Sequence, residues 1–157
     1  MANDQGNIRA SLLDRLIDQE PEVSYEPVQY RLLDMREIKA LVIRDLENLL
    51  NTRRTIYQPS AEFTELNKSV FVYGLRDFTS QSTKSTALRK ALRQDIERTV
   101  ARFEPRLRNV KIQLDSDQRG NSLRFRINAL LVIEPETEPV QFDTVFDINR
   151  SEYVITE

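Results

Sequence analysis

The chain has 157 residues, a length typical of one domain, and 23 Lys and Arg residues against 25 Asp and Glu residues. This near-neutral balance argues against a general nucleic-acid binder, which is usually strongly basic. Cys and His are both absent, which excludes disulfides, thiol and imidazole catalysis and the usual zinc ligand sets.

The three glycines also limit the function. Gly6, Gly74 and Gly120 cannot form the glycine-rich turns of nucleotide-binding motifs. Together with the missing zinc ligands, this leads us to expect no cofactor and no metal. The polar N-terminus predicts no signal peptide, and no apolar run approaches the ~20 residues of a membrane span. We therefore expect a cytoplasmic protein without membrane insertion, which is either a carboxylate-based enzyme or not an enzyme.

The first 27 residues are predicted to form an N-terminal arm, followed by a single domain over residues 28–157. Within the arm, the spacing of four apolar residues predicts a short amphipathic helix: Leu12, Leu13, Leu16 and Ile17. A helix of about two turns is marginal alone, so its apolar face is expected to dock on its own domain or on a partner.

Two longer helices are predicted next, over residues 35–51 and 86–103. Both show apolar residues at helical spacing, and Pro105 ends the second because the residue before a proline avoids the α region. Residues 52–66 between the helices read as a loop. The apolar run over residues 70–73, before Gly74, predicts a buried strand or an extended core segment.

The period of the pattern then changes to two, which predicts strands. Alternation covers residues 110–114, 123–133, 140–148 and 153–155, with a turn expected over residues 134–139. Helices first and strands afterwards indicate an α+β fold, with two main helices packed on a C-terminal antiparallel β-meander.

No pair of acids makes a compelling enzyme site. Asp143 and Asp147 share one face of a predicted strand at a separation of roughly 13 Å, given ~3.3 Å per residue. Glycoside hydrolysis needs two carboxyl groups roughly 5–9.5 Å apart.

Glu104 is the most informative single residue, because it follows the C-terminal end of a predicted helix, where the helix dipole disfavours an anion. A compensating partner is expected, and Arg102 and Arg106 are the local choices. Alternatively, Glu104, Pro105 and Arg106 form a rigid corner that is presented to another protein or that braces such a surface.

Four segments, residues 11–16, 44–54, 73–75 and 103–107, occur in the order and spacing of a known family. Through them the chain resembles the TssE family of baseplate wedge subunits in bacterial type VI secretion systems. It is similar more broadly to the sheath-initiator wedge protein of contractile phage tails. The resemblance covers residues 11–150.

The resemblance implies a structural role at a baseplate on the inner face of the cytoplasmic membrane. It implies binding to the wedge proteins TssF and TssG and assembly of the first sheath ring of TssB and TssC, with TssK and the spike hub as further partners. Glu104, Pro105 and Arg106 match the family's wedge-docking motif. The family often carries a lysozyme-like label, which the survey of carboxylates does not support.

A terminal antiparallel strand leaves unpaired backbone groups to which another chain can add a strand. We therefore predict a sheath-contact edge within residues 140–155, centred on Val140, Phe142, Thr144, Phe146 and Ile148. Two alternatives stay open, a peptidoglycan-cleaving muramidase and the equivalent wedge subunit of a phage-like contractile injector.

Overall fold

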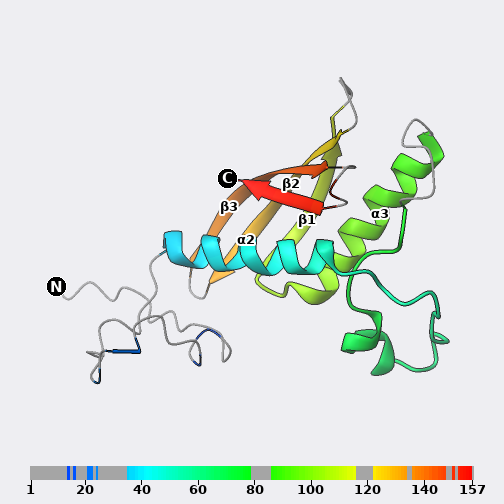
Figure 1. The fold of residues 1–157 in the computed structure, drawn as a ribbon, viewed down its shortest axis with the longest axis horizontal. Helices are drawn as coiled ribbons and strands as arrows, with labels where there is room; N and C mark the ends of the chain where they lie inside the picture. The colour runs from blue at the N-terminus through cyan, green and yellow to red at the C-terminus, as the bar shows by residue number, and fades with distance from the viewer. Residues whose placement is uncertain are drawn as a thin grey trace.

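The computed structural model describes residues 35–78, 86–115, 122–133, 136–147 and 152–156, together with six single residues. The six are Asp14, Leu16, Pro21, Glu22, Ser24 and Arg150. Among the described elements, two α-helices precede four strands (Figure 1). The elements are α2 (Met35–Asn51), the 3₁₀ turns η2 (Leu66–Lys68) and η3 (Val70–Val72), α3 (Thr86–Phe103), β1 (Leu107–Leu114), β2 (Ser122–Ile133), β3 (Glu136–Asp147) and β4 (Glu152–Thr156).

Both predicted helices are confirmed with the predicted bounds. Each helix buries one apolar stripe, with Val42 and Leu46 fully buried in α2 and Ile96 and Val100 fully buried in α3. The helices therefore form because residues three and four apart share one face that is removed from water.

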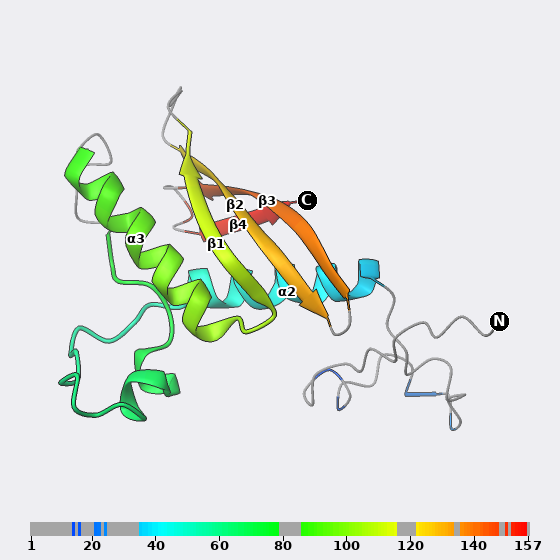
Figure 2. The same ribbon diagram turned by 180° about the vertical axis from the view of Figure 1, so that it is seen from behind.

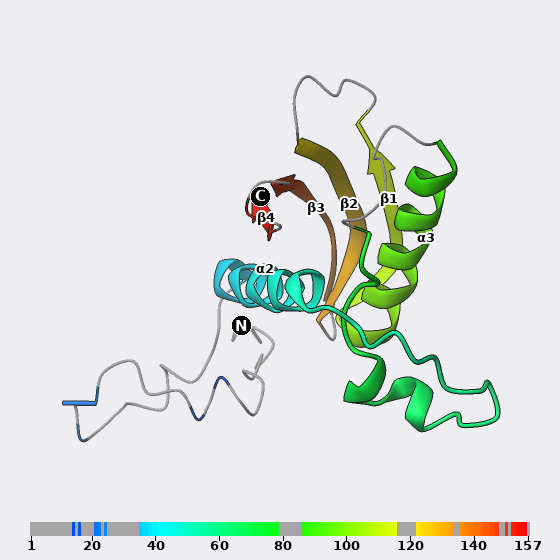
Figure 3. The same ribbon diagram turned by 45° about the vertical axis from the view of Figure 1, so that its right-hand side comes forward.

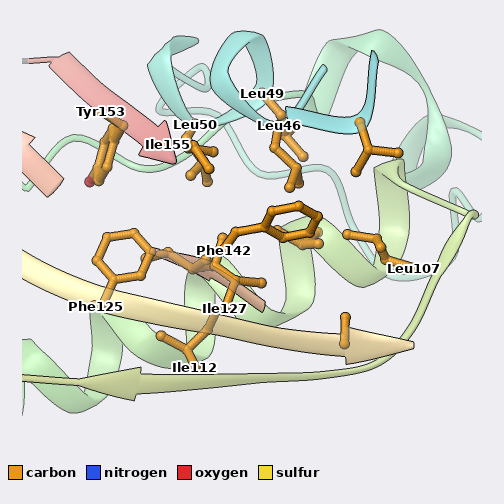
Figure 4. Packing of buried hydrophobic residues seen from close by; sticks show 14 of the residues in the cluster. Leu46, Leu49, Leu50, Leu107, Ile112, Phe125, Ile127, Phe142, Tyr153 and Ile155 are labelled. Atoms are coloured by element: carbon orange, nitrogen blue, oxygen red, sulfur yellow. The ribbon is translucent and has the colours of Figure 1, made fainter. Parts of the chain in front are cut away.

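The four strands form one antiparallel sheet in the order β1-β2-β3-β4, which confirms the predicted meander and the α+β fold. The sheet curves around α2, while α3 runs beside β1 (Figures 2 and 3). Leu46, Leu49 and Leu50 of α2 lie over the inner face of the sheet, opposite Ile127 and Phe142 (Figure 4).

The helices also use polar side chains to cover both edges of the sheet. On β4, Asn51 accepts the Tyr153 N–H at 2.7 Å and donates to the Tyr153 carbonyl at 3.0 Å, and Glu47 accepts the Ile155 N–H at 2.9 Å. On β1, Glu97 accepts the Ile112 N–H at 3.0 Å. These backbone groups are therefore not available to another strand.

The prediction for residues 70–73, a buried strand or an extended core segment, is wrong. The segment forms the 3₁₀ turn η3, in which only Val72 is buried and Val70 is 85% exposed. The hydroxyl oxygen of Ser69 accepts the Phe71 N–H at 3.2 Å, so local bonds replace those of a partner strand. An apolar run of four residues does not by itself provide a neighbouring strand.

The predicted turn over residues 134–139 is too long, because β3 already begins at Glu136. Pro139 therefore lies within the strand, opposite Leu130 of β2. Proline is tolerated there because its backbone nitrogen, which has no N–H, lies on the side away from β2. The hydrogen bonds between β2 and β3 are therefore kept, as is usual for prolines in sheets.

The predicted N-terminal helix lies mostly outside the described residues, which include neither Leu12, Leu13 nor Ile17. Asp14 and Leu16 are helical, and the Leu16 side chain is 74% exposed.

Tyr153 of β4 provides a test of the core by pH. The centroid of its ring lies 4.5 Å from the centroid of the Phe146 ring. Burial raises the pKa of the Tyr153 phenol to about 12. Between pH 10 and 12 the unfolded chain releases the phenolic proton while the folded chain keeps it, so stability present below pH 10 is lost as the pH rises. We expect this residue to lower the free energy of unfolding by about 2–3 kcal/mol over that range.

Urea unfolding at several pH values from 9 to 12 measures this loss in the native chain and in Tyr153→Phe. The variant should lose less stability than the native chain over the same range. Parallel curves for the two proteins would show that Tyr153 ionises in the folded state as it does in water.

Candidate partner-binding site at the Glu-Pro-Arg corner

The corner joins the end of α3 to the start of β1. The Glu104 N–H donates to the Val100 carbonyl at 2.9 Å, and the Leu107 N–H donates to the Glu104 carbonyl at 3.1 Å. The chain therefore turns within three residues and enters the first strand of the sheet. The Glu104 side chain is buried at this turn, with the whole residue only 4% exposed.

Arg106 holds both oxygens of the Glu104 carboxylate. Its Nε donates to Oε1 at 2.7 Å, its Nη2 to Oε2 at 2.5 Å, and its backbone N–H to Oε1 at 3.2 Å. Charge-assisted bidentate pairs of this kind are among the strongest hydrogen bonds in proteins. Hydrogen bonding to Glu104 is the main cause that raises the pKa of Arg106 above its ordinary value, so the guanidinium stays charged.

The network continues from the corner across α2. Nη2 of Arg106 donates to Asp45 at 2.6 Å, and the second Asp45 oxygen accepts from Arg44 at 2.8 Å. Arg44 also reaches Asp14 of the N-terminal arm at 2.6 Å. The alternating charges of five residues thus connect the corner, α2 and the arm. Hydrogen bonds to Asp45 and then Asp14 raise the pKa of Arg44.

The structure shows which residue pairs with Glu104 and which residues of the corner reach the surface. The compensating partner of Glu104 is Arg106, whereas Arg102 is exposed. Glu104 is not itself on the surface: Pro105 is exposed and Arg106 is partly exposed, with Glu104 behind them. The corner therefore presents Pro105 and one face of Arg106, which Glu104 and Asp45 hold in place.

A second buried network was not predicted from the sequence. Asp95 of α3 is buried, and it accepts from the Arg54 guanidinium at 3.0 Å and from the Arg76 backbone N–H at 3.1 Å. The Arg76 guanidinium lies 3.4 Å from the same carboxylate. The available signal was position, because Asp95 directly precedes Ile96 of the buried stripe.

Four of the predicted sheath-contact residues belong to β3, the third strand of the sheet: Val140, Phe142, Thr144 and Phe146. Their side chains are buried on the inner face, so a partner strand would meet the backbone of these residues and not their side chains; the predicted sheath-contact edge stays a prediction. The burial follows from the period of two, which sends these even-numbered residues toward the helices. Ile148 lies outside the described residues.

The edge of β3 is nevertheless only half covered by β4. Strand β4 pairs with residues 143–147 of β3, whereas β2 pairs with the whole strand. Among the described residues, no strand pairs with residues 136–142 on the side away from β2. A helix that could cross a membrane is not found in the part of the chain that the structure describes.

Comparisons with known proteins give the family. No curated protein matches the chain. One solved chain, from a structure described as the baseplate complex from the type VI secretion system, has the same fold with a TM-score of 0.50 and 18% sequence identity. The match covers 77% of this chain and 97% of that chain. The family model for baseplate wedge protein gp25 matches residues 36–136, which span both helices and the first two strands. The chain therefore belongs to the gp25 family of baseplate wedge proteins, in agreement with the resemblance found in its sequence.

Proposed function

We propose that this chain is a structural subunit of a type VI secretion baseplate, which docks on TssF and TssG and starts sheath assembly. Its family supports a structural role in a baseplate. The observation that carries the sheath step is the half of the β3 edge, over residues 136–142, with which no strand among the described residues pairs on the side away from β2. Under this proposal the protein works at the cytoplasmic face of the membrane, with TssK and the spike hub as further contacts.

Backbone alternation defines which groups that edge offers. The backbone N–H groups of Tyr153 and Ile155 donate to α2. The β4 residues whose backbone groups point toward β3 are therefore Glu152, Val154 and Thr156. Antiparallel ladders alternate between the two sides, and odd-numbered residues of β3 therefore direct their backbone groups away from β2. Thr137 and Gln141 offer an N–H and a carbonyl each on that side, while Pro139 offers only a carbonyl.

A strand of a sheath subunit can therefore add beside residues 137–141, in line with β4. Such strand addition obtains affinity from main-chain hydrogen bonds and leaves the buried side chains of β3 undisturbed. The edge is short, which keeps it from pairing unselectively with other chains.

We further propose that the protein is not an enzyme. Within the described residues, the carboxylates of Glu104, Asp95 and Asp14 are the most deeply buried of those in ion pairs, and each accepts a hydrogen bond from an arginine. Each of the three is thus already engaged by a cation of the protein itself. Incubation with purified peptidoglycan should release no muropeptides, and release that Glu104→Gln abolishes would support the muramidase alternative instead.

The sheath step is tested by Gln141→Pro, with Gln141→Ala as the matched control. The proline removes an N–H that faces away from β2, so the β2–β3 ladder should persist, as it does at Pro139. We expect Gln141→Pro to bind a TssF–TssG wedge like the native chain but to give at least tenfold fewer sheaths from purified TssB and TssC, counted by electron microscopy.

Gln141→Ala should behave like the native chain, because it keeps the backbone N–H. Circular dichroism and thermal unfolding establish that both variants are folded. Normal sheath numbers with folded Gln141→Pro would show that the sheath does not add to this edge, and failure of the native chain to bind the wedge would contradict the docking step.

A further inference from the structure

The long connection between α2 and α3 carries most of the large hydrophobic side chains that are exposed in the described part of the chain. Of the eight large hydrophobic side chains that are exposed there, six lie within residues 55–72: Ile56, Tyr57, Phe63, Leu66, Val70 and Phe71. Ile56 is fully exposed and Val70 is 85% exposed. Long connections with little regular secondary structure are usually functional or disordered, and this one, whose regular structure among the described residues is the two short 3₁₀ turns η2 and η3, is held in place.

The two ends of the connection are bound to each other. The Leu75 N–H donates to the Thr52 carbonyl at 2.9 Å, and the Arg54 N–H donates to the Leu75 carbonyl at 2.8 Å. Asp95 of α3 then binds the side chains of both Arg54 and Arg76. This clamp fixes the base of the segment to the core.

Internal bonds also order the segment itself. The Asn67 amide donates to the Ser60 carbonyl at 2.8 Å and to the Phe63 carbonyl at 2.9 Å. The rings of Tyr57 and Phe71 meet edge to face with centroids 6.0 Å apart, which brings the two arms of the segment together. The apolar side chains are thus displayed on a preformed loop, which reduces the entropy that a partner must remove on binding.

The loop and the corner lie at the same end of the molecule. Figures 1 and 2 show the segment beside the C-terminal end of α3. Tyr73, just after the segment, packs its ring 5.1 Å from that of Phe103, next to Glu104. Besides burial, the charges of Asp45 and Glu104 raise the pKa of Tyr73. A protein that covers Pro105 can therefore reach the loop as well.

The charges beside the apolar residues indicate the chemistry of the occupant. Residues 55–72 contain the exposed acids Glu62 and Glu65 and one base, Lys68, which lies 3.8 Å from Glu65. The loop is therefore apolar and aromatic with a net negative charge. Such a surface suits an apolar segment that also carries Arg or Lys, which can pair with the acids and stack on the aromatic rings.

We propose that residues 55–72 form a preformed docking loop for the same wedge partner that contacts the corner, and that this loop binds an apolar segment bearing basic residues. This inference rests on the proposed function, since it extends the wedge contact from the corner to a second surface. Asp95 is the residue that positions the loop, through its bonds to Arg54 and Arg76.

The double variant Ile56→Ser with Val70→Ser tests the docking loop, with Val154→Ser as the matched control. All three side chains are at least half exposed, so the fold should persist, and Val154 lies on β4, away from the loop. Binding of the full chain to purified TssF–TssG is measured by biolayer interferometry. We expect the double variant to bind at least tenfold more weakly and Val154→Ser to bind within twofold of the native chain.

The charge of the occupant is tested by Glu62→Lys with Glu65→Lys, which should weaken binding at least threefold at low salt and less at high salt. If the Ile56 and Val70 double variant binds with native affinity, the docking loop is overturned. If Pro105→Ser loses binding in that case, the proposed docking at the corner still stands. Light scattering of the free chain covers the other occupant: a dimer that the double variant dissociates would assign the loop to self-association and also overturn the inference.

Discussion

Replacing Glu104 by Ala is expected to lower the free energy of unfolding by about 2–4 kcal/mol. Removal of one partner from a buried ion pair typically costs about 3–5 kcal/mol, because the remaining charge is left in the protein without compensation. Here Asp45 still contacts Arg106 at 2.6 Å, which places the expected loss toward the lower end. For a domain of this size, the melting temperature should fall by about 5–12 °C.

Chemical and thermal unfolding measure this loss, and Arg102→Ala is the matched control. Arg102 is an exposed charged residue in the last turn of α3, so its replacement should stay within about 0.5 kcal/mol of the native chain. Asp45→Asn, which removes the charge that Arg106 and Arg44 share, should give an intermediate loss. Equal stability of Glu104→Ala and Arg102→Ala would mean that the bidentate pair adds no net stability.

This result also decides how binding data at the corner can be interpreted. Glu104 is buried, so Glu104→Ala changes the support of the corner rather than its surface. Weaker wedge binding in that variant is consistent with either a lost contact or a displaced Arg106. Pro105→Ser separates the two cases, because Pro105 is exposed and lies outside the ion-pair network.

The sequence was most informative where structure depends on near neighbours. The helical bounds followed from apolar spacing and from Pro105, and the meander followed from alternation in strands that each bury one face. The pairing of Glu104 with Arg106 was among the local choices because the two residues are only two positions apart.

Features that depend on distant residues were not predictable in the same way. Asp45 joins Arg106 across 61 positions, and Arg54 joins Asp95 across 41, and no local pattern links such pairs. The apolar run at residues 70–73 predicts a buried strand or an extended core segment and yet forms a 3₁₀ turn, because local pattern does not show whether a neighbouring strand exists. The coverage of the β3 edge likewise depends on the length of β4, which pairs with residues 143–147 of β3 and, within the described part of the chain, is the only strand on that side.

Gly74→Ala is expected to lower the free energy of unfolding by about 3 kcal/mol, because two separate costs apply at this position. The backbone of Gly74 has a φ of +97°, a conformation that residues with a side chain rarely adopt. An added Cβ would lie 2.3 Å from the Thr52 carbonyl oxygen, which is backbone and cannot rotate away. That same oxygen accepts the N–H of buried Leu75, so relief of the clash breaks the clamp at the base of the loop.

The effect should be concentrated in the connection between the helices, and this distinguishes it from a general loss of stability. Urea unfolding gives the total cost, and limited proteolysis reports where the chain opens: Gly74→Ala should be cut faster within residues 55–72 than the native chain is. Gln58→Ala, an exposed change in the same segment, should match the native chain in both measurements. If Gly74→Ala is as stable as Gln58→Ala, the contact between Gly74 and Thr52 does not hold the loop, and the preformed docking surface loses its structural basis. If it is less stable and binds the wedge more weakly, clamp and docking are coupled, because the loop then binds only while its base is closed.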